Sequence, residues 1–106
     1  MPDDPGPVFA ALADPTRRTI FERLAREGDT TATTLASGLP VTRQAVSKHL
    51  AALEDAGLIA GQRQGREHRY APSPAPLAEA AQWMARVGGE WDERLARLGR
   101  AATTRR

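Results

Sequence analysis

The 106-residue sequence contains no cysteine, so disulfide bonds, thiolate metal sites and cysteine nucleophiles are excluded together. It also has no apolar run near the roughly 18 residues that a membrane span needs. Its first seven residues contain two aspartates and three prolines, without the basic start and apolar stretch of an export signal. We therefore expect a cytoplasmic protein that does not bind membranes.

A strong net charge is missing as well. The chain carries 15 basic and 13 acidic side chains, for a formal net charge of +2, and 41% of its residues are apolar. Acidic residues outnumber basic ones in residues 1–30, and basic residues outnumber acidic ones in residues 41–70, but a net charge this small does not identify a partner by itself. Length and composition predict one globular domain over residues 8–100, with flexible ends at 1–7 and 101–106.

Helix signals begin at Asp14-Pro15, which places an acceptor side chain at the N-cap and a proline at the first helical position. Gly28 supplies the stop for this helix. The apolar residues that precede Asp14 indicate a short additional helix on the same core. These residues are Val8, Phe9 and Leu12.

A helix-turn-helix layout follows. Residues 31–37 are expected to form one or two helical turns. Gly38 and Pro40 would end them, because proline cannot continue a helix. Thr42 can then cap a helix that continues to about Ala56, and Gly57 acts as its stop. Two helices separated by a tight turn are typical of the helix-turn-helix motif.

The helix after Thr42 separates an apolar face from a polar face. At about 100° per residue, Val46, Leu50 and Leu53 fall on one stripe, and polar side chains fall on the opposite side. Glutamine, serine and lysine can read base edges or phosphates in DNA, although a solvated helix face is the alternative interpretation. His49 beside the stripe is interpreted as a structural histidine or a phosphate donor. The candidate DNA contacts here are Thr42, Arg43, Gln44, Ser47, Lys48 and His49.

A basic hairpin is expected next. Strands over 58–63 and 68–71 flank the loop 64–67, which has the length and the glycine of a hairpin connection. Three arginines crowd around this loop, so the hairpin would project a positive tip suited to phosphate or minor-groove contact. A solvated loop is the alternative. The candidate contacts are Arg63, Arg66 and Arg69.

The proline-free stretch over 77–100 predicts a last helix with an apolar stripe that repeats every seven residues. This stripe is more apolar surface than one helix at the edge of a small monomer can easily hide, so a partner helix would bury it. The alternative is that it closes the monomer's own core, to which Trp83 would also belong. Gly88-Gly89 leaves a bend or a break in the helix open. The stripe consists of Leu77, Met84, Trp91 and Leu98, with Ala81 and Leu95 beside it.

Three stretches carry a family resemblance: ALADPTRRTIFERLA, VTRQAVSKHLAALEDAGLI and RQGREHRYAPSPAPL. Over about residues 8–98 the chain resembles the arsenical-repressor (ArsR) family of winged helix-turn-helix regulators. The segment WMARVGGEWDERLARL is similar to a branch of that family that does not sense metals and has two tryptophans in the last helix. The resemblance implies a mainly α fold with a small β-hairpin wing and a homodimer formed through the N- and C-terminal helices. The implied dimer contacts are Val8, Phe9, Leu12, Leu77, Ala81, Met84, Trp91, Leu95 and Leu98.

Metal sensing is not expected from these residues. Metal-sensing members of the family resemble one another in cysteine pairs near the helix before the turn, or in histidine and carboxylate sets on the last helix. In this chain the helix before the turn reads ATTLAS, without cysteine, and the last helix contains no histidine. Carboxylates alone favour harder ions and bind them weakly at exposed helix surfaces. We therefore predict no metal, no cofactor and no catalytic site.

Together these patterns predict a sequence-specific regulator of transcription. It would be a homodimeric repressor, acting on its own promoter or a nearby one, that binds double-stranded DNA at a partly palindromic operator. The alternative is a winged-helix module that binds a protein instead of DNA. Constitutive repression, release by a small molecule and release by a partner are all compatible with the sequence.

Overall fold

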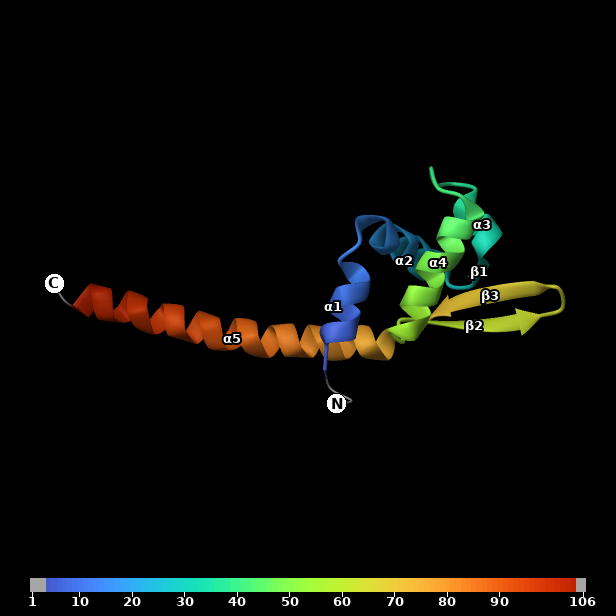
Figure 1. The fold of residues 1–106 in the computed structure, drawn as a ribbon. Helices are drawn as coiled ribbons and strands as arrows, with labels where there is room; N and C mark the ends of the chain where they lie inside the picture. Colours follow the sequence, from blue (N-terminus) through green and yellow to red (C-terminus); the bar gives the residue numbers. More distant parts are fainter. Residues whose placement is uncertain (1–3, 105–106) are drawn as a thin grey trace.

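A group of short helices and a small sheet form the body of the molecule, and one long helix projects from it (Figure 1). The computed structural model describes residues 4–104 and the side chains of residues 4–101. The projecting helix gives the molecule an extent of 71 Å along its longest axis. In chain order the elements are α1 (Gly6–Leu12), α2 (Pro15–Glu27), β1 (Thr30–Thr31), α3 (Ala32–Ala36), α4 (Arg43–Asp55), β2 (Ile59–Gln64), β3 (Glu67–Pro72) and α5 (Pro74–Thr104).

Polar caps and glycines bound the helices where the sequence predicted. The Asp14 carboxylate caps α2 by accepting from the N–H of Arg17 at 3.0 Å, and the Thr42 hydroxyl caps α4 by accepting from the N–H of Ala45 at 3.0 Å. Gly28 ends α2 with a φ of +84°, in the left-handed region that glycine adopts without strain. The helix-turn-helix formed by α3 and α4 is confirmed.

The hydrophobic core lies between α1–α4 and the sheet. The stripe predicted on α4, Val46, Leu50 and Leu53, is fully buried in this core. Val8 of α1 is only 4% exposed and packs in the same core, although the family resemblance implied a place at the dimer interface. Since its own chain already covers it, Val8 has little surface left for a partner subunit.

The sheet has three antiparallel strands in the order β1-β3-β2, whereas the sequence predicted a two-stranded hairpin alone. Strand pairing continues out to Gln64 and Glu67, so only Gly65 and Arg66 remain in the turn, and the expected four-residue loop is wrong. Gly65 adopts a φ of +61° there, as tight hairpin turns require. The third strand, β1, is only two residues long and pairs with β3, which is too short for an alternating pattern to reveal.

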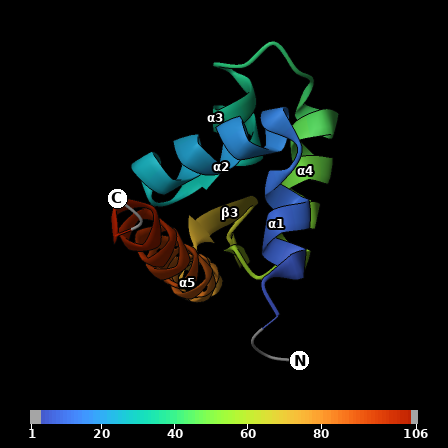
Figure 2. The same cartoon turned by 90° about the vertical axis from the view of Figure 1, so that its left-hand side faces the viewer.

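Helix α5 begins three residues earlier than predicted and runs unbroken through Gly88-Gly89. Its early start has a physical reason, since Pro74 and Pro76 lie in the first turn, where the missing N–H donors have no helical partner in any case. The body touches only the first part of α5, where Ala80 is buried, and it lies on one side of the helix (Figure 2). None of the helices within residues 4–104 has the length and hydropathy that crossing a bilayer requires.

Candidate nucleic-acid interface

The polar face of α4 is open to solvent. Arg43, Gln44, Ser47 and Lys48 are exposed, and they line one surface hollow together with Thr42. In the described part of the chain, no hydrogen bond or ion pair engages the side chains of Gln44, Ser47 or Lys48. Burial of the opposite face fixes this orientation, because the core stripe holds α4 in place.

His49 differs from the other candidate contacts on α4, because it is half-buried and faces α2. Its Nδ1 accepts a hydrogen bond from Nε of Arg17 at 3.4 Å, and Nη1 of Arg17 donates to the carbonyl of Ala11 at 3.3 Å. Arg17 therefore connects the end of α1 with α4. Its backbone N–H also lowers the pKa of Asp14, to which it donates the cap hydrogen bond. No local sequence pattern singles out Arg17, since its partners lie on other helices.

The wing arginines near the turn are exposed beside α4. Arg63 lies near the end of β2 and Arg66 in the turn, and both side chains are open to solvent. A second hollow connects α3, α4 and the wing, with Arg43, Ser47 and Arg66 on its walls. The structure thus brings the polar face of α4 and the wing tip to the same space, although the two elements are separate in sequence.

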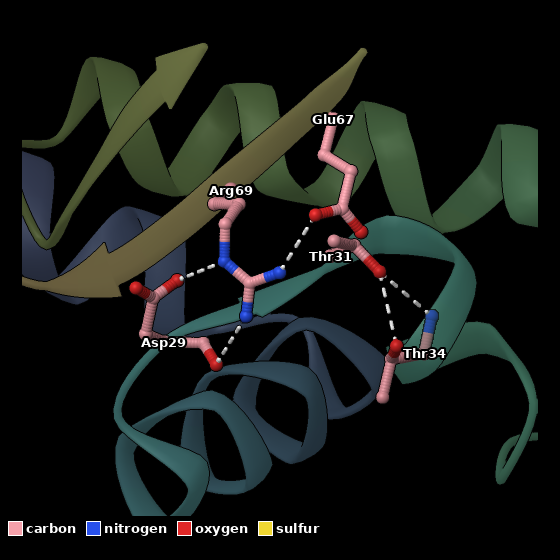
Figure 3. Close-up of polar contacts among 5 residues, drawn as sticks. All are labelled: Asp29, Thr31, Thr34, Glu67 and Arg69. Carbon is pink, nitrogen blue, oxygen red and sulfur yellow. Dashed lines mark hydrogen bonds and ion pairs between the residues drawn. The ribbon is translucent and has the colours of Figure 1, made fainter. Parts of the chain in front are cut away.

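Arg69 is placed differently from the other two arginines. Its Nε donates to Oδ1 of Asp29 at 2.9 Å, its Nη2 donates to the Asp29 carbonyl at 3.3 Å, and its Nη1 donates to Oε1 of Glu67 at 3.2 Å (Figure 3). The hydrogen bond and opposite charge of Asp29 raise the pKa of Arg69. The alternation of side chains along a strand could have predicted this difference. Arg63 is paired with His68 and points to the same face of the sheet, whereas Arg69, the next residue after His68, points to the opposite face.

The base of the wing packs tightly against the end of α4. The rings of His68 and Tyr70 stack with centroids 4.6 Å apart, above Gly61 on the neighbouring strand. A Cβ at Gly61 would lie 2.6 Å from Nε2 of His68, so a side chain there would displace the ring. The N–H of Gly61 donates to Oε2 of Glu54 at 3.3 Å, and burial, with a smaller effect of Glu54, raises the pKa of Tyr70.

Helix α5 presents an apolar stripe that the single chain leaves uncovered. Its large apolar side chains beyond the body are 44–61% exposed. The stripe is continuous because its members recur at spacings of three, four or seven residues, which places them on one helix face. Where α1 crosses α5, the rings of Phe9 and Trp83 meet edge-on with centroids 5.6 Å apart. The uncovered part of the stripe consists of Met84, Val87, Trp91, Leu95 and Leu98, of which Val87 was not among the predicted members.

The remaining predicted dimer contacts lie near this stripe or in the body. Leu77 and Ala81 are exposed on the first turns of α5, and Phe9 is exposed on α1. Leu12 is half-buried and packs against the core. Among the described residues, no three histidine or carboxylate side chains come together as a set of metal ligands.

A helix-turn-helix followed by a basic hairpin defines a winged helix-turn-helix protein, and comparison with known proteins agrees. Residues 12–62 match the family model described as "Helix-turn-helix domain". The chain belongs to the ArsR family of winged helix-turn-helix transcriptional regulators. It is 35% identical to the transcriptional repressor SdpR of Bacillus subtilis over 77 residues, which cover 73% of this chain and 84% of SdpR.

Solved structures of similar proteins share the fold. An ArsR-like transcriptional regulator from Rhodococcus sp. RHA1 superposes with a TM-score of 0.81 at 46% identity, covering 92% of each chain. The homodimeric winged helix-turn-helix DNA-binding domain Mb0332 from Mycobacterium bovis superposes with a TM-score of 0.61 at 28% identity, covering 85% of this chain and 80% of that one. The predicted winged helix-turn-helix fold and the family are therefore confirmed, while dimerisation through the terminal helices and the two-tryptophan branch stay predictions.

Proposed function

We propose that this regulator is a homodimeric repressor that binds a partly palindromic operator in double-stranded DNA. The observation that carries the proposal is the free polar face of α4, on which Gln44, Ser47 and Lys48 are exposed without an intramolecular partner in the described part of the chain. Such a face beside a wing that carries Arg66 is suited to a major groove and its flanking phosphates. A repressor of this kind acts in the cytoplasm, where the chromosome lies.

The exposed side chains divide into two kinds of contact. Gln44 can donate and accept at one adenine, whereas Ser47 can bond to several base edges, so these residues would read sequence. Lys48 and Arg43 can reach guanine or phosphate. Arg63 and Arg66 on the wing would bind phosphates or enter the minor groove, which supplies affinity without sequence information. The Thr42 hydroxyl already accepts the cap hydrogen bond, so it has a donor left for a phosphate.

Dimerisation would cover the uncovered stripe of α5 and bring two copies of α4 to one face. Recognition helices about 34 Å apart fit successive major grooves, with half-site centres about ten base pairs apart. The homodimeric state of the Mycobacterium bovis domain supports this arrangement. The proposed contacts are Phe9, Leu12, Leu77, Ala81, Met84, Trp91, Leu95 and Leu98.

Selection of bound duplexes from a random pool by the purified protein tests the proposal. We expect a partly palindromic sequence to be enriched, and its affinity to exceed that of a scrambled duplex by a factor on the order of 10³ or more. Failure to retain any duplex, even at low salt, would contradict the proposal and favour a protein partner instead.

Gln44→Ala should lose discrimination at one base position in each half-site. The expected loss is about 1–3 kcal/mol against the wrong base, because the bidentate pair disappears while phosphate contacts remain. Binding isotherms on the operator and on single-position variants of it would measure this loss. Gln82→Ala is the matched control, since Gln82 is exposed on α5, opposite its apolar stripe. An equal loss of affinity for operator and scrambled duplexes would refute the reading role of Gln44.

Arg66→Ala should weaken binding to all duplexes alike. Because each neutralised phosphate releases counterions, the slope of log affinity against log salt should become shallower by about one unit per subunit. A salt series on operator and scrambled duplexes measures the slope. Arg97→Ala removes the same charge from an exposed position on α5 outside the apolar stripe and should leave the slope unchanged. A selective loss on the operator would instead assign Arg66 to base readout.

A further inference from the structure

The Arg69 cluster, which comprises Asp29, Glu67 and Arg69, connects the wing to the segment that leads into the helix-turn-helix (Figure 3). Arg69 lies on β3, the central strand, and Asp29 immediately precedes β1 on the sheet edge. The two residues are 40 positions apart in sequence, and Asp29 accepts hydrogen bonds through both its carboxylate and its carbonyl. The cluster therefore ties together two segments that only the tertiary structure brings into contact.

Asp29 lies just before β1, which leads directly into α3. The next residues form β1, where Thr31 pairs with Arg69 across the sheet. The Thr31 hydroxyl also caps α3 by accepting from the N–H of Thr34 at 3.2 Å. A single backbone segment thus carries the partner of Arg69, the edge strand and the cap of the first helix of the motif. Movement of the wing away from this segment would break the Arg69 contacts.

The charge of the cluster argues against a phosphate contact by Arg69. One guanidinium faces two carboxylates, so the cluster as a whole is negative, and three of the five guanidinium N–H donors already have acceptors. A phosphate would have to approach both carboxylates to reach the remaining donors. The Arg69 side chain is 28% exposed, compared with 54% for Asp29 and 59% for Glu67. The carboxylates therefore face the solvent more than the guanidinium does.

We propose that Arg69 is a positioning residue, which sets the wing relative to the helix-turn-helix so that α4 and the wing tip contact one duplex together. This inference rests on the proposed function. Backbone pairing of β1 with β3 anchors the base of the wing, whereas the outer part, from Gln62 to Glu67, is exposed. Without the cluster this outer part would sample a wider range of orientations about the base, and ordering it would consume part of the binding free energy.

Variants of the full chain test the inference on operator and scrambled duplexes over a salt series. Arg69→Gln and Asp29→Asn should each lower operator affinity about threefold to tenfold, the range expected when a preorganised group becomes mobile. The double variant should lose no more than either single variant, because all of them break the same pair. The salt slope should stay unchanged for Arg69→Gln, in contrast to Arg66→Ala.

The sign of the Asp29→Asn effect separates the two roles of Arg69. If Arg69 bound phosphate, removing Asp29 would free a cation, and both affinity and salt slope would rise; that result overturns the inference. Glu22→Gln, an equal charge change on the exposed face of α2, corrects for net charge. Thermal melting checks that each variant is folded. If Arg69→Gln melts at a lower temperature than the wild type, the operator affinities and salt slopes of Asp29→Asn and Glu22→Gln decide between the two roles of Arg69. Wild-type protein that binds no duplex would instead refute the proposed function and this inference with it.

Discussion

Trp91→Glu should separate the subunits and lower operator affinity by more than about 100-fold, because the second half-site contact loses its high effective concentration. Trp91 lies in the middle of the apolar stripe on α5 and is 58% exposed in the single chain. A carboxylate there would be buried without a partner in a dimer, at a cost that association cannot offset. The monomer should stay folded, since Trp91 takes no part in the core.

Sedimentation and binding isotherms on full and half operators would measure the effect of Trp91→Glu. Gln82→Glu is the matched control, because it introduces the same charge on the opposite face of α5 and should leave the dimer intact. Circular dichroism confirms that both variants keep their helices. A monomeric Trp91→Glu protein that binds the full operator as tightly as the wild type would show that dimerisation does not contribute to binding.

Leu50→Ala should lower the free energy of unfolding by about 2–5 kcal/mol, because a fully buried leucine leaves a cavity that the neighbouring helices fill only in part. Alanine favours a helix at least as well as leucine, so the loss reports packing and not helix propensity. A small domain is stable by only about 5–15 kcal/mol, and the change would therefore unfold a measurable fraction of the protein.

Urea unfolding of Leu50→Ala is best measured in the Trp91→Glu background, where association makes no contribution. Leu95→Ala is the matched control, since it removes the same atoms from a residue that is 54% exposed in the single chain. In that background Leu95→Ala should change the stability by no more than about 0.5 kcal/mol. Equal losses for the two leucines would mean that the C-terminal part of α5 folds back onto its own body.

The parts of the fold that were predicted correctly depend on contacts within a few residues. Caps and stops at Asp14, Gly28 and Thr42 act on one helical turn, and the stripe on α4 follows from the helix period alone. The hairpin turn and the start of α5 were misplaced by one to three residues, because strand pairing and the first helical turn are decided by neighbouring segments. Strand β1 was missed, since two threonines show no period.

Local patterns in the chain specify most of the helix bounds, the polar face of α4 and the basic wing, because periodicity, caps and turn residues express interactions between near neighbours. Packing between distant elements sets the pairing of Arg69 with Asp29, the direction of His49 toward Arg17 and the point at which α5 leaves the body. These contacts join segments 32 to 40 residues apart or depend on where the body ends along a helix. A side chain's partner at that separation follows from how the elements pack, which no local pattern encodes.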